Sequence, residues 1–199
     1  FTNKGPFLNN STGTLNSYAT VINDSSVVSY GNVKLYKTSN FTNNNLIENR
    51  NILRNYGTLI NNKDFKTYHS SAYDNYNAFT NNSNGTVTNN SVFINKKLNS
   101  TNPDSVDLTG IGGVITNNGT ILHKLNTLTN FGTITNSTSG IITNKSTILI
   151  DSVGLVTNNN LITNDSILTN DGSITNNLSK TINNNKTFTN KNVINNYGI

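Results

Sequence analysis

Apolar residues recur at intervals of twenty along this sequence. In the second half of the chain they form three series, offset from one another by six, eight and six residues. The series are Leu128, Ile148, Leu168 and Phe188; Val114, Ile134, Ile174 and Ile194, with Gly154 interrupting; and Leu122, Ile142, Ile162 and Ile182. Three short apolar segments per twenty residues are typical of a solenoid, in which each coil stacks on the last and buries one apolar residue per side.

The first half of the chain carries the same three series. They are Leu15, Val33, Leu53 and Tyr73; Val21, Phe41, Leu59 and Phe79; and Val27, Ile47, Phe65 and Val87. The predicted fold is therefore all-β: a three-sided parallel β-helix, or β-solenoid, of about 20 residues per coil and roughly ten coils. We expect residues 1–199 to form one continuous solenoid.

Within each side, the local pattern is apolar-Thr-Asn-x-Gly-Thr, as at 128–133 and 115–120. Alternation along a strand directs the apolar residue and the Asn inward and the Thr outward. Gly is expected to supply the backbone freedom that a corner needs. Stacked amides can form hydrogen-bonded ladders from coil to coil. The predicted stacks are Asn130, Asn170 and Asn190; Asn144, Asn164 and Asn184; and Asn136, Asn176 and Asn196.

Composition alone favours disorder, because Asn-rich chains of low complexity often lack a fold. The chain has 45 Asn among 199 residues, with 33% hydrophobic and 12% charged residues. A disordered chain has no reason to keep three apolar series in phase, so the phasing favours the solenoid. The rhythm breaks near 94–107, where Pro103 cannot donate to a ladder. We expect an irregular loop insertion there, with a binding loop as the functional alternative.

Several classes of protein are disfavoured by composition. The chain has no Cys, which excludes disulfides and thiolate metal sites. No apolar run is long enough for a membrane span. The net charge of +5 is dispersed rather than gathered into the basic stripe that nucleic-acid binding needs. Neither end has the pattern of a cap, so we expect the repeat to continue in a longer chain or in a second copy stacked end to end.

The pattern Leu-x-Asn-x-Gly-x-Ile at 128–134 and 168–174, with Leu59 in the last place at 53–59, resembles the repeats of filamentous-haemagglutinin-type adhesins and related autotransporter passenger domains. The resemblance implies a right-handed solenoid. It also implies an extracellular or cell-surface location and a non-catalytic role as a structural rod or in attachment. Similar repeats would suit a surface filament or a viral fibre, so a virion surface remains an alternative.

A column of aromatic residues is the candidate binding site. Tyr18, Tyr36, Tyr56 and Tyr76 follow one another at spacings of 18, 20 and 20 residues, at positions expected to face outward. Such a column of exposed rings has two interpretations. It either stabilises neighbouring coils by stacking, or it forms a platform for surface glycans or a host receptor.

Residues with catalytic or metal-binding chemistry are sparse and scattered. Asp151 and Asp171 should stack, with Lys191 one coil on to offset their repulsion, but two carboxylates are too few for a good calcium site. Polysaccharide-degrading solenoids need clustered Asp residues near an Arg. His69 and His123 are expected to lie more than two coils apart. We therefore expect no enzyme, no cofactor and no metal site.

Thr-x-Thr triplets at 127–129 and 187–189 raise the alternative of an ice-binding face. Leu149 and Ile167 break this array on its own face, and outward Thr is an ordinary choice for a strand. The sequence therefore favours a structural rod, a segment of a filament, fibre or adhesin. Its expected partners are itself and, in the adhesin alternative, surface glycans or a host receptor.

Overall fold

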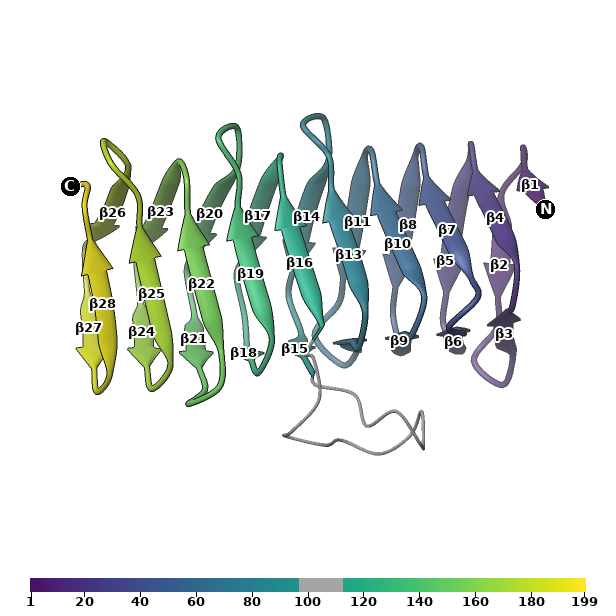
Figure 1. Cartoon of the computed structure of the whole chain (residues 1–199). Coiled ribbons are helices and arrows are strands. Elements are labelled where there is room, and N and C mark those ends of the chain that lie inside the picture. Colours follow the sequence, from purple (N-terminus) through teal and green to yellow (C-terminus); the bar gives the residue numbers. More distant parts are fainter. Residues whose placement is uncertain (97–112) are drawn as a thin grey trace.

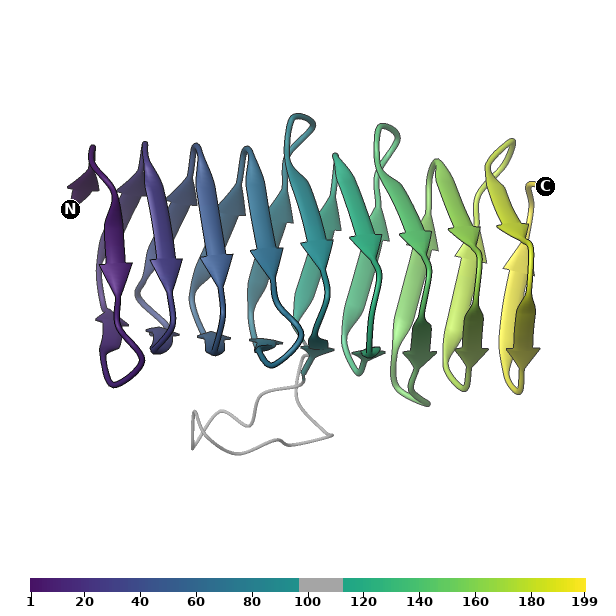
Figure 2. The ribbon, with the colours of Figure 1, turned by 180° about the vertical axis from the view of Figure 1, so that it is seen from behind.

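The computed structural model describes residues 1–96 and 113–199, and all regular elements in these ranges are β-strands. The strands form a stack of parallel coils with three sides (Figure 1). Seen from behind, the N-terminal and C-terminal coils lie at opposite ends of the stack (Figure 2).

Each side of the stack is one parallel sheet of nine or ten strands. Sheet 1 contains β1 (Thr2–Asn3), β4 (Thr20–Asn23), β7 (Asn40–Asn43), β10 (Thr58–Asn61), β13 (Ala78–Asn81), β16 (Val114–Asn117), β19 (Thr133–Asn136), β22 (Leu155–Asn158), β25 (Ser173–Asn176) and β28 (Val193–Asn196). Sheet 2 contains β2 (Phe7–Asn9), β5 (Ser26–Ser29), β8 (Leu46–Asn49), β11 (Asp64–Thr67), β14 (Thr86–Asn89), β17 (Thr120–His123), β20 (Ile141–Asn144), β23 (Leu161–Asn164) and β26 (Thr181–Asn184). Sheet 3 contains β3 (Thr14–Ser17), β6 (Asn32–Leu35), β9 (Ile52–Asn55), β12 (Ala72–Asn75), β15 (Val92–Asn95), β18 (Thr127–Asn130), β21 (Thr147–Ile150), β24 (Ile167–Asn170) and β27 (Thr187–Asn190).

Every strand pairs in parallel with the strand three places along the chain, which confirms the predicted three-sided parallel solenoid. Leu59, for example, pairs with Phe41 on one side and Phe79 on the other, as the twenty-residue series predicts. The irregular loop expected near 94–107 lies, from residue 97 onward, outside the described residues.

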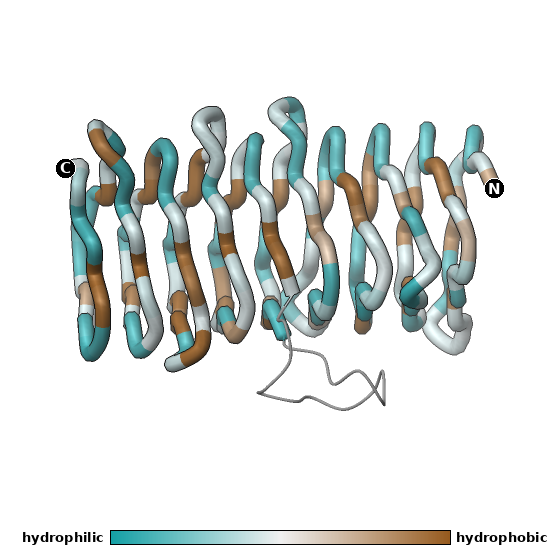
Figure 3. The backbone as a smooth tube through the Cα atoms, in the orientation of Figure 1, coloured by the Kyte–Doolittle hydropathy of each residue, from teal (hydrophilic) through white to brown (hydrophobic). Residues whose placement is uncertain are grey.

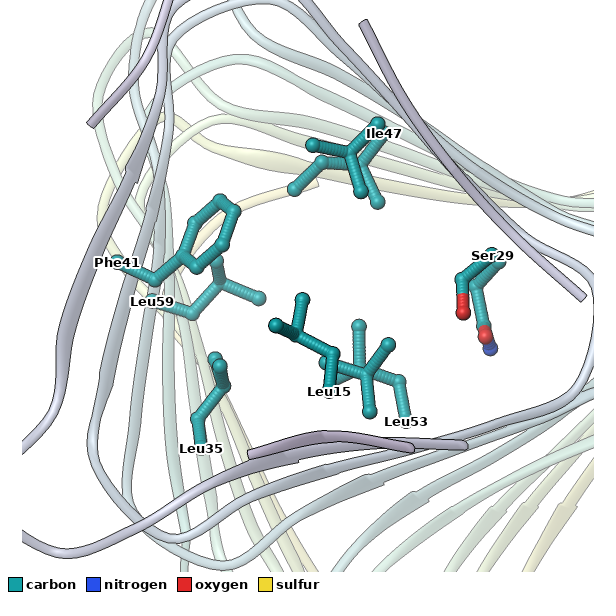
Figure 4. A pocket seen from close by; sticks show the side chains of 10 residues that line it. Leu15, Ser29, Leu35, Phe41, Ile47, Leu53 and Leu59 are labelled. Atoms are coloured by element: carbon teal, nitrogen blue, oxygen red, sulfur yellow. The ribbon is translucent and has the colours of Figure 1, made fainter. Parts of the chain in front are cut away.

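Alternation within the four-residue strands builds the interior. In most strands the second and fourth residues are buried, and these are an aliphatic or aromatic residue and an Asn. Apolar segments accordingly recur at corresponding positions in many coils (Figure 3). Leu15, Phe41 and Ile47 come from sheets 3, 1 and 2 and point toward a common centre (Figure 4).

The predicted series were wrong at three positions in the second half. Ile115, Ile121 and Val156 face inward, in place of Val114, Leu122 and Gly154. The connections between strands vary by one or two residues, so counting by a fixed twenty slips by one or two positions here. A slip of one residue exchanges the faces of a strand, and Val114 is therefore 38% exposed.

The middle coils of the core are filled differently from the coils that follow them. Phe65, Tyr73, Phe79 and Phe93 meet at tilted and edge-on angles, with ring centroids 4.7–6.4 Å apart. Between Phe93 and Phe188 the coils contribute Ile, Leu and Val, and they surround a cavity of about 40 Å³. Aliphatic side chains from three sides fill the centre less completely than interlocking rings.

The Asn residues form the predicted ladders, and sheet 1 has the longest. Every strand of sheet 1 ends in Asn, and each side chain donates from Nδ2 to Oδ1 of the Asn one coil further on, over 2.7–2.9 Å. The ladder runs without a gap from Asn3 to Asn196. In the other two sheets, Asn144 donates to Asn164, and Asn170 donates to Asn190, as expected.

All these side-chain bonds point the same way, from the N-terminal to the C-terminal end. A ladder position that cannot donate therefore leaves the next carbonyl without its ladder donor. After Leu35, the backbone amide of Gly57 replaces that donor at Asn55, but in two other coils nothing does. Ile150 precedes Asn170 in sheet 3, and Asn170 Oδ1 is buried without a partner. Ser29 precedes Asn49 in sheet 2, its hydroxyl donates to the Gly31 carbonyl instead, and Asn49 Oδ1 is also unpartnered.

The glycines at the corners serve a different purpose from the one expected. No described glycine has a positive φ, whereas Asn126 and Ser179 do. A Cβ on Gly132 would lie inside van der Waals distance of the Gly113 carbonyl oxygen, and one on Gly172 would meet the Gly154 carbonyl. Glycine is required because successive corners approach too closely for a side chain.

His123 replaces Asn in the ladder of sheet 2. Its Nδ1 lies 2.9 Å from Asn89 Nδ2 and accepts, while its Nε2 donates to the carbonyl oxygens of Asn126 and Thr147 at 3.2 and 3.0 Å. These partners assign the single proton to Nε2. Burial lowers the pKa of His123, against the opposing effect of the two carbonyl bonds.

Acidification should therefore weaken the stack at this coil. The pKa of an unfolded His is about 6.5, so below that pH the unfolded chain binds the proton more readily and the free energy of unfolding falls. The His123→Asn variant should no longer lose free energy of unfolding on acidification. The control variant His69→Asn, which changes an exposed ring, should lose as much as the unmodified chain. Urea unfolding at pH 7.5 and 5.5 measures the effect. An undiminished loss in His123→Asn would contradict this assignment.

Candidate functional site

The predicted tyrosine column exists and lies just after the strands of sheet 3. Tyr18, Tyr36, Tyr56 and Tyr76 directly follow β3, β6, β9 and β12. The backbone amides of the last three donate one coil back, to Ser17, Leu35 and Asn55, at 2.7–2.9 Å. Main-chain pairing thus places the four residues in one line along the stack.

The expectation of four exposed rings was wrong for half of the column. Tyr18 is 59% exposed, but Tyr56 and Tyr76 are only 2% and 5% exposed. Tyr18 stacks on Tyr36 with centroids 4.0 Å apart, and Tyr56 stacks on Tyr76 at 4.5 Å. Within each of these two pairs, the rings leave adjacent coils at one corner and cover each other's faces.

Basic side chains flank these stacks. Lys34 Nζ lies 4.9 Å from the ring centre of Tyr36 and 5.4 Å from that of Tyr56, so one cation contacts both stacked pairs. Lys96 Nζ lies 5.2 Å from the Tyr76 ring centre and donates to its hydroxyl at 3.2 Å. The column is therefore an aromatic and cationic surface whose accessible part is Tyr18 and Tyr36.

Asp74 holds the cations at the covered end of the column. Its carboxylate accepts Lys96 Nζ at 3.1 Å and lies 3.6 Å from Arg54 Nε, and its side chain is 9% exposed. Burial alone lowers the pKa of Lys96, but Asp74 and Tyr76 outweigh it and the net pKa is raised. A buried carboxylate with two cations is held in place, which suits a structural role for this end.

A second aromatic cluster, which the sequence analysis missed, spans three coils between sheets 2 and 3. The Arg50 guanidinium lies between the rings of Tyr30 and Tyr68, at 5.2 and 4.0 Å. Glu48 accepts Arg50 Nη2 at 2.8 Å and the Tyr68 hydroxyl at 2.9 Å. Burial raises the pKa of Glu48, but these two donors outweigh it and the net pKa is lowered. The spacings of 20 and 18 residues could have revealed this column.

The other candidate residues do not assemble a reactive site. Lys191 lies 3.2 Å from Asp171, which stacks over Asp151 as expected. His69 and His123 are closer than expected: they lie two coils apart at the same corner, with Asn126 between them at 3.5 and 3.2 Å. Both ring nitrogens of His123 already make hydrogen bonds in the ladder of sheet 2. Within residues 1–96 and 113–199, no three His, Asp or Glu side chains gather as metal ligands would.

The hydroxyl array of sheet 3 is interrupted where the sequence indicated. Leu149 pairs between Thr129 and Thr169, and Ile167 pairs between Thr147 and Thr187. Among the described residues there is no helix that could span a membrane.

The chain matches no protein-family model, and the comparisons with curated proteins and with solved structures gave no match. What it shares with the adhesin-type repeats that its sequence resembles is the architecture, a β-solenoid of stacked parallel coils.

Truncation of the tyrosines should separate the structural end of the column from the accessible end. Tyr76→Ala removes a buried ring and the hydroxyl that Lys96 contacts, so the free energy of unfolding should fall by about 3 kcal/mol. Tyr18→Ala, at an exposed ring, should cost less than about 1 kcal/mol. Urea unfolding of both variants tests this. Equal losses would mean that burial does not distinguish the two ends.

Proposed function

We propose that this chain is a non-catalytic structural rod, a segment of an extracellular filament, fibre or adhesin displayed on a cell or virion surface. The observation that carries the proposal is the unbroken ladder of buried Asn side chains from Asn3 to Asn196. With main-chain pairing at every coil, it resists both bending and separation of coils. Length and stiffness along one axis are the properties that a surface rod needs.

The first and last coils support a proposal about the axial partner. Asn184, Asn190 and Asn196 are exposed at the C-terminal coil, where they end their ladders. Because the ladders have one direction, these amides offer Nδ2 hydrogens, whereas Asn3 and Asn9 at the other end offer Oδ1. A further coil of the same kind, supplied by the same chain or by a second copy, would continue the ladders.

A second candidate function, glycan or host-receptor binding in an adhesin, is favoured by Tyr18 and Tyr36. Their stacked pair is the accessible part of the column, and Lys34 lies beside it. An exposed ring next to a cation suits the face of a sugar ring or a partner side chain. Ice binding has no comparable support, because Leu149 and Ile167 interrupt the hydroxyl array.

Electron microscopy tests the rod proposal. Gold-labelled antibody against this chain should mark thin straight structures on the outside of intact cells or particles. Concentrated protein should form fibres with an axial X-ray reflection at about 4.8 Å. Asn190→Asp and Asn196→Asp together should weaken end-to-end growth, since a carboxylate cannot donate.

The matched control is Asn183→Asp with Asn195→Asp, which adds the same charge at exposed, outward positions of the last coil outside the ladders. It should leave growth unchanged. Label confined to the cell interior would contradict the proposed location. Equal loss of growth in both double variants would contradict the role of the ladder amides in axial contact.

A further inference from the structure

A polar hollow lies on the outer corner between sheets 1 and 2, away from the tyrosine column. Four residues, 82–85, connect β13 to β14, whereas two residues make the same connection in the coils on either side. The longer connection rises above its neighbours at the upper edge of the stack (Figure 1). Beside it is a hollow of about 410 Å³, lined by Asn62, Asn82, Ser83, Asn84 and Asn118.

The backbone around this hollow is held rigidly. The Gly85 amide donates to the Asn82 carbonyl at 2.7 Å, and the buried Asn81 side chain donates to the Gly85 carbonyl at 3.0 Å from below. On the next coil, a Cβ at Gly119 would collide with the carbonyl oxygens of both Asn82 and Gly85. The projecting turn therefore rests directly on the following coil, and the backbone beneath the hollow is held in place before any ligand binds.

The amides on one wall are oriented by a second ladder, on the outside of the stack. Asn82 Nδ2 donates to Asn62 Oδ1 at 2.6 Å, Asn62 to Asn44 at 2.7 Å, and Asn44 to the Asp24 carboxylate at 2.7 Å. The ladder stops at Asn82, because Asn118 does not donate to it. The hollow lies at this break, with Asn82 on one coil and Asn118 on the next both in its lining.

The remaining polar groups of the lining are available to a ligand. Within the described residues, the side chains of Ser83, Asn84 and Asn118 make no hydrogen bond. Two amides and a hydroxyl, together with the Asn82 carbonyl, provide both donors and acceptors. None of the five lining residues is charged, aromatic or aliphatic, so hydrogen bonds are the directional contacts that the lining offers.

We propose that this hollow is a binding site for a neutral polyhydroxylated ligand, a sugar unit of an uncharged glycan. Its volume falls within the roughly 300–1,000 Å³ of small-molecule sites. Amide groups can pair with neighbouring hydroxyls of a sugar as donor and acceptor at once, and a neutral lining gives no advantage to acidic or basic ligands. The site is separate from Tyr18 and Tyr36, and it does not depend on the proposed rod function.

Nuclear magnetic resonance titration of the full chain tests the site. The probes are cellotetraose, maltotetraose, mannotetraose and tetra-N-acetylchitotetraose, with an oligogalacturonate as the acidic comparison. At least one neutral probe should shift the side-chain amide signals of Asn84 and Asn118. Asn84→Ala and Asn118→Ala should each weaken that binding by about two- to tenfold. Asn177→Ala, at the same corner but outside the lining, should leave it unchanged.

Both lining variants remove side chains that hold no other element, so their thermal unfolding should match that of the unmodified chain. Three outcomes would overturn the proposal: no shift with any neutral probe, preferential binding of the acidic probe in the hollow, or neutral binding that Asn118→Ala leaves intact. Shifts confined to Tyr18 and Tyr36 would overturn the hollow while supporting the adhesin alternative. The rod proposal would be unaffected by any of these results.

Discussion

The stack depends on a buried amide that bonds forward along the axis. Within the ladder of sheet 1, an Asn such as Asn43 donates from Nδ2 to the next coil and accepts at Oδ1 from the coil before. The same Nδ2 commonly reaches a backbone carbonyl as well, as Asn23 does with Leu46. One side chain thereby satisfies the corner backbone and joins neighbouring coils. Buried polar groups normally cost stability unless every group is paired, and the ladder supplies that pairing in most coils.

The amide ladders also give the stack a direction, from its N-terminal to its C-terminal end. Because donation runs one way, a single residue without a donor affects the coil after it rather than both neighbours. Ile150 and Ser29 illustrate this, since the unpartnered oxygens are those of Asn170 and Asn49. His123 keeps the direction by accepting at one nitrogen and donating at the other. A substitute such as His123 therefore satisfies its neighbours by accepting from the coil before and donating to a backbone carbonyl of the coil after, whereas Ile150 and Ser29 each leave one buried oxygen unpartnered.

The sequence predicted the architecture because one period governs both the apolar and the amide positions. Register was less predictable. Val114 and Leu122 were predicted to face inward, but the connections between strands vary by a residue or two. A period of twenty gives no information on the length of each connection. The exposure of Tyr56 and Tyr76 depends on stacking and on Lys34 and Lys96, which approach from other coils. The hollow at Asn118 lies where a long connection is next to a short one. Predicting it from the sequence would require the true register of the strands.

The most direct test of forward amide bonding is to place an Asn at Ile150, where the ladder of sheet 3 is interrupted. Ile150→Asn loses about 1.5–3 kcal/mol of apolar burial but gives Asn170 Oδ1 the donor it lacks, which should recover about 1–3 kcal/mol. Ile148→Asn, two residues away in the same strand, loses similar burial with no ladder partner. Urea unfolding should therefore place Ile150→Asn within about 1 kcal/mol of the unmodified chain, while Ile148→Asn falls by about 4 kcal/mol. Equal destabilisation by the two substitutions would contradict the claim that forward amide bonding holds the coils together.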